Sequence, residues 1–448
     1  MIFSNQRNPI LPLDIHIPDS EAHVMSDGKL YIYGSFDDRE DVYCSDQYRV
    51  VSTADMKNWQ VHPVSFRGQD VPWQEDPDAP HYPGLDWSHP TPFIQKMLDQ
   101  LTADGDDMKA RFEENLNAKK PPLLFAPDCI EKDGRYYLYF CVVDESEGVA
   151  VSDRPEGPFT DPVQLPCGGI DPAVFIDEDG QAYYYWGQIF SHGVRLQEDM
   201  ISFDQDGIVD DLVTEEQHYF HEGSSMRKIG DTYYYVYADM ERGKPTSLGY
   251  STGKSPLGPF TYQGIIIDND GCDPQSWNNH GSIECVNGQW YVFYHRCSRG
   301  TQQHRRLCIE KIRVLEDGSI PEVKMTSQGV GEPFGPGETI YGYQACQLTG
   351  QCFIDVDEEY GEVLRSITPG DTAVFRYIRS NSPWSGCCIK ARGKGKIRIF
   401  IGAEFAGEVI VNGSDEVSVP IQASGEEAEL KLVFEEASEL ELLSVTLF

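Results

Sequence analysis

Five short runs of alternating apolar and polar residues stand out along the first 300 residues, each directly behind a tight-turn pair. The runs are rich in tyrosine: DGKLYIYGS from Asp27, DGRYYLYF from Asp133, DGQAYYYWG from Asp179, GDTYYYVYA from Gly230 and NGQWYVFYH from Asn287. Asp–Gly and Asn–Gly tolerate the positive φ angles of a two-residue hairpin turn, and period-two alternation is typical of strands. A short apolar stretch precedes each turn, so the pattern predicts five β-hairpins of one type.

A second motif lies between the hairpins and indicates a longer repeat. SDRPEGPFTDP begins at Ser152, STGKSPLGPFTYQG begins at Ser251, and VSTADMKNW from Val51 is a looser relative. We interpret these segments as the outer strands of repeated units. Unrelated hairpins in a β-sandwich are the alternative, but five similar hairpins with outer motifs between them favour a five-bladed β-propeller over residues 1–325.

Two regions depart from the repeat. Residues 65–122 form an insertion, and its second half (TPFIQKMLDQLTADGDDMKARFEENLNAKK) has apolar residues at helical spacing. An insertion of this length inside a compact domain is often a lid or a wall of a site. In residues 335–448 the tyrosine hairpins stop and short alternating strands take over, which predicts an all-β, jelly-roll-like β-sandwich.

Charge narrows the classes of function. The 73 acidic and 36 basic residues give a formal charge of −37, which argues against nucleic acid and anionic membranes as partners. We see neither a secretory signal nor an apolar run long enough to span a membrane. We therefore expect a cytoplasmic protein, and secretion stays open if the sequence is truncated at its start.

Polar residues lie shortly before every hairpin turn, where the inner strand of a propeller blade would begin. They are four carboxylates and one histidine: Asp19, Asp128, Asp171, Glu222 and His280. One Asp before a strand is usually a turn residue, but five at similar offsets converge on one end of the propeller axis. Buried carboxylates that lie close together separate in pKa, so that one serves as an acid and another as a base. The pattern suggests a hydrolase that uses a carboxylate pair.

These segments resemble glycoside hydrolase family 43, whose members are five-bladed propellers, over roughly residues 8–325. NPILPLDIHIPDSEAHV is similar to the opening segment that carries the general base, which implies this role for Asp19, with Asp14 as the alternative. IDPAVFIDEDGQAYYYWG implies that Asp171 orients the acid and raises its pKa. HEGSSMRKIGDTYYYVY implies that Glu222 is the general acid.

The same resemblance implies further site residues. FAPDCIEKDGRYYLYF is similar to a second-blade motif, so Asp128 and Phe125 would line the site, and Trp186 would contact substrate at the end of the third-blade motif. His280 in NNHGSI matches a histidine that in some members lies near a metal, often calcium, in the central channel. In YHRCSRGTQQHRRLCIE the resemblance implies a substrate-contacting arginine, Arg305, with Arg306 as the alternative.

The C-terminal region resembles a carbohydrate-binding module of family 6 type through ITPGDTAVFRYI and IKARGKGKIRIFIG. Trp384 in this region is either a sugar-stacking platform or, as we prefer, a core residue.

The resemblance implies an inverting, exo-acting glycosidase that needs no cofactor. Its substrate would be a plant cell-wall oligo- or polysaccharide bearing α-L-arabinofuranosyl or β-D-xylosyl units. Inversion requires the acid and the base to stand roughly 6.5–9.5 Å apart. Two alternatives stay open: a glycoside phosphorylase, with His304, Arg305 and Arg306 offered to phosphate, and a non-catalytic sugar-binding propeller.

Overall fold

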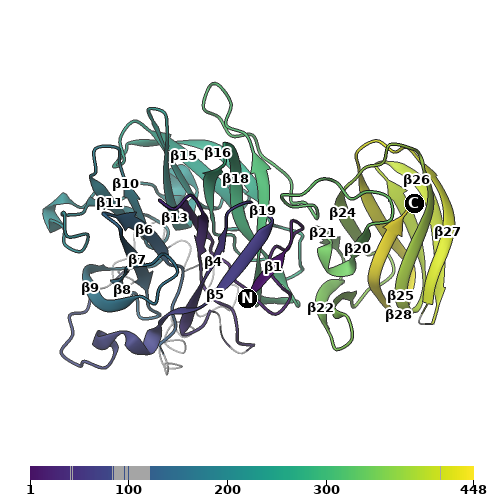
Figure 1. Cartoon of the computed structure of the whole chain (residues 1–448), viewed down its shortest axis with the longest axis horizontal. Helices are drawn as coiled ribbons and strands as arrows, with labels where there is room; N and C mark the ends of the chain where they lie inside the picture. The colour runs from purple at the N-terminus through teal and green to yellow at the C-terminus, as the bar shows by residue number, and fades with distance from the viewer. Residues whose placement is uncertain are drawn as a thin grey trace.

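The computed structural model describes residues 1–40, 42, 44–82, 84, 95, 99, 122–413 and 415–448. Five small antiparallel sheets surround one axis, and a nine-stranded sheet lies to one side of them at the C-terminal end of the chain (Figure 1). The fold is therefore a five-bladed propeller followed by a sheet-rich region, as predicted. The helix predicted for the second half of the 65–122 insertion lies, apart from residues 95 and 99, outside the described residues.

The innermost strand of each blade meets the innermost strand of the next, so the ring closes on itself. In cyclic order, β2 contacts β6, β6 contacts β10, β10 contacts β13, β13 contacts β17, and β17 returns to β2. Ser20 and Gly281 form the bridge between the first and the last blade. These inner strands are β2 (Glu21–Val24), β6 (Asp128–Lys132), β10 (Ala173–Ile176), β13 (Phe220–Ile229) and β17 (Ser282–Val286).

Each inner strand is joined to the second strand of its blade by one of the predicted turns. In the second and fifth blades both turn residues have positive φ, at Asp133–Gly134 and Asn287–Gly288, as a two-residue turn of this type requires. The tyrosines behind the turns are mostly buried between blades, which explains their abundance. The second strands are β3 (Leu30–Tyr33), β7 (Arg135–Cys141), β11 (Ala182–Trp186), β14 (Thr232–Asp239) and β18 (Gln289–Ser298).

The second repeat motif joins the third strand of a blade to the fourth, which confirms its assignment to the outer strands. It connects β4 (Gln47–Thr53) to β5 (Asn58–Arg67), β8 (Ser146–Ser152) to β9 (Thr160–Gly168), and β15 (Ser247–Gly253) to β16 (Phe260–Asp268). The third and fifth blades have three strands each and end with β12 (His192–Arg195) and β19 (Thr301–Ile312). The N-terminal β1 (Ile2–Ser4) pairs with β5 as the outermost strand of the first blade.

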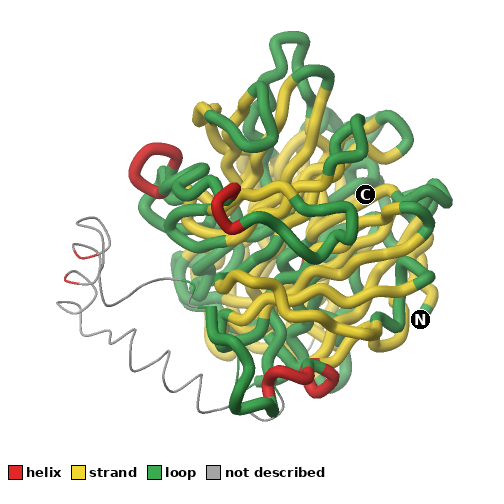
Figure 2. The backbone as a smooth tube through the Cα atoms, turned by 90° about the vertical axis from the view of Figure 1, so that its left-hand side faces the viewer, coloured by secondary structure: helices red, strands yellow, loops and turns green. Residues whose placement is uncertain are grey.

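Helical segments are short in the described part of the chain (Figure 2). Two 3₁₀ turns begin the insertion, and there Trp73 stacks on Phe140 of the second blade with ring centroids 5.9 Å apart. In these residues no helix has the length and hydropathy that a membrane crossing requires. The helical segments are η1 (Gly68–Asp70), η2 (Pro72–Gln74), η3 (Gln205–Gly207), α3 (Glu215–His218) and η4 (Gly342–Gln344).

The C-terminal strands form two layers that share two long, bent strands. β25 (Trp384–Ile401) and β28 (Ala428–Leu447) pair along their length and change register near Gly393, where Glu439 also has positive φ. On one side of this bend they pair with β27 (Asp415–Ala423), β20 (Thr339–Tyr341) and β23 (Gly361–Arg365), which continues to β22 (Phe353–Asp357). On the other side they pair with β26 (Glu404–Asn412) and β24 (Thr372–Ile378), which continues to β21 (Gln347–Thr349).

Both layers contribute to one hydrophobic core, so the predicted sandwich is present. Trp384 belongs to this core at 1 % exposure, which excludes it as an exposed sugar platform. β25 and β28 are longer than the short strands expected from the sequence, because bulges let each of them pass from one layer to the other without a turn.

The sandwich is joined to the fifth blade by buried polar contacts. Glu362 of β23 forms an ion pair with Arg306 of β19, and both side chains are almost fully buried. Backbone hydrogen bonds link Arg299 to Ile354 at 2.6 Å and Gln328 to Arg376 at 2.9 Å.

Candidate active site

Three of the five predicted polar residues occupy the same position in their blades. Asp19, Asp171 and His280 each lie two residues before the inner strands β2, β10 and β17, so their side chains gather at one end of the axis. Nδ1 of His280 is 4.0 Å from Asp19 and 3.7 Å from Asp171. Asp19 and Asp171 have φ of 54° and 55°, an uncommon conformation for a residue other than glycine.

Asp19 is buried against an arginine. Nη1 of Arg305 donates to both carboxylate oxygens of Asp19 at 2.8 and 3.0 Å, while Nε and Nη2 hold Asp37 at 2.9 Å each. Burial by itself raises the pKa of Asp19, but the nearby positive charge, Arg305 first, outweighs it and the pKa is lowered. Asp19 is therefore ionised at neutral pH, as a general base must be.

The pKa of Asp171 is shifted in the opposite direction. Burial, followed by the negative charges of Glu222 and Asp19, raises the pKa of Asp171 well above its usual value. Its carboxyl also accepts a hydrogen bond from the backbone N–H of Gly223, the residue after Glu222. Asp171 thus contacts the peptide that carries the predicted acid.

Glu222 lies inside β13, where the pairing with β14 changes register on both sides of it. This irregularity turns the half-buried side chain toward two amides. Nε2 of Gln188 donates to Oε2 at 2.8 Å, and Nδ2 of Asn278 donates to Oε1 at 3.2 Å. The next residue, Gly223, has φ of 74°, and a Cβ there would come within 2.8 Å of the His280 ring. Glycine is therefore required beside Glu222.

A hydrogen-bonded chain joins the surroundings of Asp19 to those of Glu222. The backbone N–H of Asp19 lies 3.4 Å from Nδ1 of His295, whose Nε2 is 3.1 Å from the side-chain oxygen of Asn278. Asn278 in turn donates to Glu222. Burial lowers the pKa of His295 to about 3, so the ring is neutral and can accept at one nitrogen while it donates at the other.

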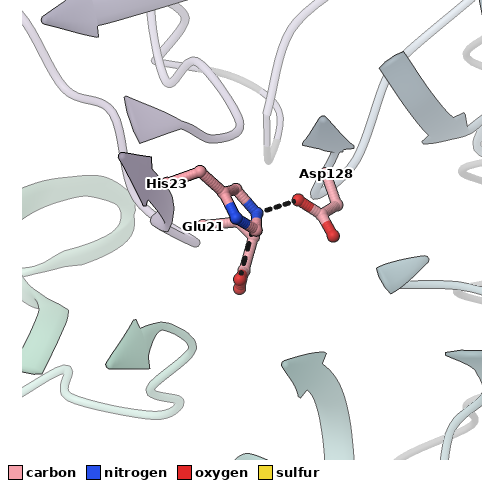
Figure 3. Close-up of side chains that lie close together, drawn as sticks. All are labelled: Glu21, His23 and Asp128. Carbon is pink, nitrogen blue, oxygen red and sulfur yellow. Dashed lines mark hydrogen bonds and ion pairs between the residues drawn. The ribbon is translucent and has the colours of Figure 1, made fainter. Parts of the chain in front are cut away.

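Asp128 lies deeper than the sequence offsets suggested. It is the first residue of β6, as Glu21 is the first residue of β2, so these two form the next layer of the channel. Nε2 of His23 contacts Asp128 at 2.7 Å and Glu21 at 3.5 Å (Figure 3). We call Glu21, His23 and Asp128 the axial cluster. Arg227 of β13 closes it from another blade with a 2.8 Å ion pair to Glu21.

The other predicted substrate contacts have different surroundings. Trp186 is 3 % exposed, and its ring stacks on Tyr184 and His192 within a hydrophobic cluster. Phe125 is half-buried against the cluster between the first two blades, and its carbonyl accepts a hydrogen bond from Tyr48. Arg305 lies behind Asp19 at full burial. Its position fits holding Asp19, and its predicted substrate contact stays a prediction.

The basic residues considered as phosphate ligands do not form one binding site. Arg305 faces Asp19 and Asp37, whereas Arg306 is directed to Glu362 in the sandwich. His304 packs edge-on against His16 at 5.2 Å. Because the two guanidinium groups are committed to carboxylates on different sides of β19, this arrangement disfavours the phosphorylase alternative.

Sequence reasoning missed Asp37, Gln188, Asn278 and His295. Asp37 and Gln188 follow the second strands of the first and third blades, Asn278 lies in the loop before β17, and His295 is on β18. Their positions do not recur from blade to blade, so no repeat marked them. Of the four, Gln188 was the easiest to predict from the sequence, because it directly follows the Trp–Gly pair that closes the third-blade motif.

The chain is similar to proteins of known family. The model of glycosyl hydrolases family 43 matches residues 95–320. A xylosidase/arabinosidase from Thermoclostridium stercorarium is 32 % identical over 391 residues, which cover 76 % of this chain and 72 % of that protein.

Two solved structures are similar as well. A family 43 β-xylosidase/α-arabinofuranosidase from a compost microbial metagenome, in complex with xylotriose and free of calcium, is 27 % identical with a TM-score of 0.54; the match covers 72 % of this chain and 99 % of that one. An arabinoxylan arabinofuranohydrolase from Bacillus subtilis shares the fold over 97 % of this chain and 96 % of its own, at 22 % identity and a TM-score of 0.51. The family match and the 32 % identity to the Thermoclostridium stercorarium protein confirm the prediction: this chain belongs to glycosyl hydrolases family 43 and is a glycosidase.

Proposed function

We propose that the chain is an inverting, exo-acting glycosidase that releases α-L-arabinofuranosyl or β-D-xylosyl units from plant cell-wall saccharides. One observation carries the proposal. Asp19, whose pKa is lowered, and Asp171, whose pKa is raised, lie at the same end of the axis as Glu222. Inverting glycosidases need an ionised base and a protonated acid at one site.

Asp19 is the proposed base. It accepts a proton from the water that attacks the anomeric carbon, and Arg305 keeps its carboxylate ionised before that step. The two bonds from Nη1 leave little freedom to the carboxylate, so its direction is fixed before substrate binds.

Glu222 is the proposed acid, with Asp171 as its positioning partner. Two negative charges close together in a buried site are costly, and this charge is one cause of the raised pKa of Asp171. Burial and this charge therefore let Asp171 retain a proton that an isolated carboxyl would lose. Gln188 and Asn278 fix the rotamer of Glu222, so the proton is aimed at the glycosidic oxygen.

The names of relatives support a pentose substrate. The Thermoclostridium stercorarium protein is named for both xylose and arabinose, and the metagenome enzyme holds xylotriose. Residues of the third blade that form a narrow pocket beside Gln188, among them Phe190 and His192, are the nearest candidates to contact the leaving sugar.

A calcium ion in the channel is implied by the family resemblance, and one structural feature fits it. Oε2 of Glu21 is buried without a hydrogen-bond partner, and the axial cluster brings three potential ligand atoms within 4.8 Å of one another. Among the described residues this group does not include His280, whose Nδ1 faces Asp19 and Asp171. An ion held by the axial cluster would add positive charge beneath the carboxylates, and the mechanism proposed above does not depend on it.

The test is hydrolysis of p-nitrophenyl β-D-xyloside and α-L-arabinofuranoside, with the first anomer released followed by proton NMR. An inverting enzyme releases α-xylose from the β-xyloside, and initial release of the β-anomer would refute the assignment of Asp19 as a base.

Glu222→Gln provides the control for the acid. We expect kcat for the xyloside of an unactivated alcohol to fall about 10³-fold, within the range for general acid catalysis. The loss should be much smaller for a 2,4-dinitrophenyl leaving group, which departs without a proton. Equal losses on both substrates would show that Glu222 is not the acid.

A further inference from the structure

A buried carboxyl lies behind the wall of the candidate active site, and the mechanism proposed above does not use it. Glu147 is on β8, where the pairing with β9 changes register between Ser146 and Gly148. Its side chain is 0 % exposed. A carboxyl that has no access to water needs either a cation or a proton.

Among the described residues, the surroundings of Glu147 supply no cation. Oε2 accepts a hydrogen bond from the Tyr184 hydroxyl on β11 and lies 3.6 Å from Sγ of Cys167 on β9, whereas Oε1 is buried without a hydrogen-bond partner. Cys141 lies opposite Glu147 on β7, and the charge that acts on Glu147 is the negative charge of Glu145. Burial raises the pKa of Glu147 to about 8, so the carboxyl is protonated at neutral pH.

Glu147 packs directly against the segment that carries Asp171. A Cβ added to Gly169 would lie 3.1 Å from Oε1 of Glu147 and 2.7 Å from the Trp186 ring, so the backbone of Gly169 leaves no room for a side chain. On β7, the thiol of Cys141 accepts a hydrogen bond from the backbone N–H of Asp171. The carboxyl and the thiol therefore both support the chain just before and at Asp171.

The same segment is joined to the residue that holds the proposed acid. The carbonyl of Ile170 accepts a hydrogen bond from the N–H of Gly187 at 3.0 Å. Gln188 follows directly and donates its hydrogen bond to Glu222. A shift of Gly169 and Ile170 thus reaches Asp171 through the chain and Glu222 through Gln188.

This segment also separates Glu147 from solvent. Gly168, Gly169 and Ile170 line the narrow pocket beside Gln188. An ionised Glu147 would leave Oε1 without a hydrogen bond, and an unsolvated buried carboxylate is costly. Displacement of residues 168–170 would admit water from the pocket and remove that cost. Ionisation therefore favours a displaced segment.

We infer that Glu147 is a positioning residue for the hydrolysis: its protonated carboxyl supports residues 168–171, and loss of that proton displaces them together with Asp171. The inference rests on the proposed function for the role of Asp171. Glu147 acts through Gly169 and does not contact the reacting atoms. The enzyme thus loses activity in mildly alkaline solution for a reason separate from the titration of Asp171 and Glu222.

The test is Glu147→Gln in the full chain, which keeps the shape and an acceptor for Tyr184 but cannot ionise. We measure kcat from pH 6 to pH 10 on the p-nitrophenyl glycoside that is cleaved faster. The ratio of the variant's rate to that of the unmodified chain at each pH cancels the titration of Asp171 and Glu222, which both proteins share. About one-tenth of Glu147 keeps its proton at pH 9, so this ratio should rise about tenfold between pH 6.5 and pH 9.

Tyr184→Phe separates the positioning role from general damage. The Tyr184 hydroxyl lowers the pKa of Glu147, so its removal raises that pKa further. The alkaline loss of kcat should therefore move to higher pH in this variant. A defect of packing alone would lower kcat at every pH and leave the position of the loss unchanged.

Glu310→Gln is the matched control. Glu310 on β19 is also a buried acid, with a pKa raised to about 7, but its partners are Tyr294 and Thr326 and it does not contact residues 168–171. The ratio of its rate to that of the unmodified chain should stay constant with pH.

Three results would overturn the inference: a constant ratio for Glu147→Gln, an alkaline loss that does not move to higher pH in Tyr184→Phe, or an equal rise of the ratio in Glu310→Gln. Failure of the proposed function appears separately, as no hydrolysis of either p-nitrophenyl glycoside by the unmodified chain.

Thermal unfolding detects the proton of Glu147 without reference to activity. Its folded-state pKa is raised, so the melting temperature of the unmodified chain, relative to Glu147→Gln, should fall as pH rises from about 4.3 to about 8. A difference that is constant over this range would show that Glu147 does not hold a proton there, and would contradict the inference whatever the substrate.

Discussion

Asp19 and Asp171 occupy the same place in two blades and share the same backbone conformation, yet their surroundings give them opposite protonation behaviour. Each lies two residues before an inner strand with φ near 55°. Asp19 faces Arg305, and its pKa is lowered despite burial; Asp171 faces Glu222, and burial with that charge raises its pKa. The repeat therefore provides equivalent positions, and the neighbouring side chains assign a different role to each.

The largest difference between Asp19 and Asp171 should appear in kcat when each is replaced by asparagine. Asp19→Asn removes the proposed base, and we expect kcat to fall about 10³- to 10⁴-fold. Asp171→Asn keeps an oxygen that can accept the Gly223 N–H and removes the group that titrates beside Glu222, so we expect a fall of about 10²-fold. Steady-state rates on the p-nitrophenyl substrate that the enzyme prefers measure both. A larger loss for Asp171→Asn would reverse the assigned roles.

Arg305→Met tests whether Arg305 is the reason that the pKa of Asp19 is lowered while that of Asp171 is raised. It leaves Asp19 and Asp37 buried without their cation, and breaking a buried ion pair costs roughly 3–5 kcal/mol. The pKa of Asp19 should rise, so the acidic limb of kcat/KM should move to higher pH. Urea unfolding measures the first effect and a pH–rate profile measures the second.

Arg306→Met is the control for Arg305→Met, because it removes a buried guanidinium from the same strand that faces Glu362 instead. It should also destabilise the protein but leave the acidic limb in place. A similar shift of the limb in both variants would show that the effect is not specific to Asp19.

The same substitution should change stability in opposite directions at the two positions. The folded-state pKa of Asp19 is lowered, so its ionisation contributes stability above the unfolded pKa near 3.9, and this is lost as pH falls. Asp19→Asn should lower the unfolding free energy at pH 7.5 by roughly 3 kcal/mol, because Arg305 loses one of its two partners.

For Asp171 the folded-state pKa is raised, so stability decreases as pH rises above the unfolded pKa. Asp171→Asn should therefore raise the melting temperature at pH 7.5 and have less effect near pH 4. Scanning calorimetry at the two pH values measures whether each variant raises or lowers the melting temperature. Destabilisation by both variants at pH 7.5 would contradict the electrostatic contrast.

The smallest expected effect concerns the amides that hold Glu222. Gln188→Leu should lower kcat about tenfold with KM nearly unchanged, because a misdirected acid affects the transition state more than binding. Asn278→Leu removes a longer hydrogen bond, 3.2 Å instead of 2.8 Å, and also interrupts the chain to His295. Gln188→Glu keeps the shape but replaces the N–H donors by a carboxyl, and recovery of activity in it would argue against the amide role.

The propeller could be predicted from sequence because its hairpins depend on local chemistry. Asp133–Gly134 and Asn287–Gly288 fix a turn whatever surrounds them, and Asp19, Asp171 and His280 share a fixed offset from the inner strands. Asp128 was expected in the same layer because its offset was counted from the turn. The longer turns of the first and third blades hide the fact that Asp128 corresponds to Glu21.

The remaining site residues depend on contacts between distant parts of the chain. Arg305 reaches Asp19 and Asp37 across more than 260 residues, and Asn278 meets Glu222 across 56. The fusion of predicted strands into β25 and β28 has a similar cause, since a bulge is favoured by the pairing of two bent strands and has no strong signal in either alone.

Arg305 and Arg306 are neighbours on β19 that point in different directions, one to Asp19 in the propeller and one to Glu362 in the sandwich. A chain that ended after β19 would expose the Arg306 guanidinium and withdraw its only carboxylate partner among the described residues, one position away from the arginine that holds Asp19. The C-terminal part therefore supplies the counter-charge of a buried arginine of the fifth blade. Deletion or exchange of this part during evolution would have to be accompanied by a change at Arg306, so the two parts of the chain are expected to be inherited as one unit.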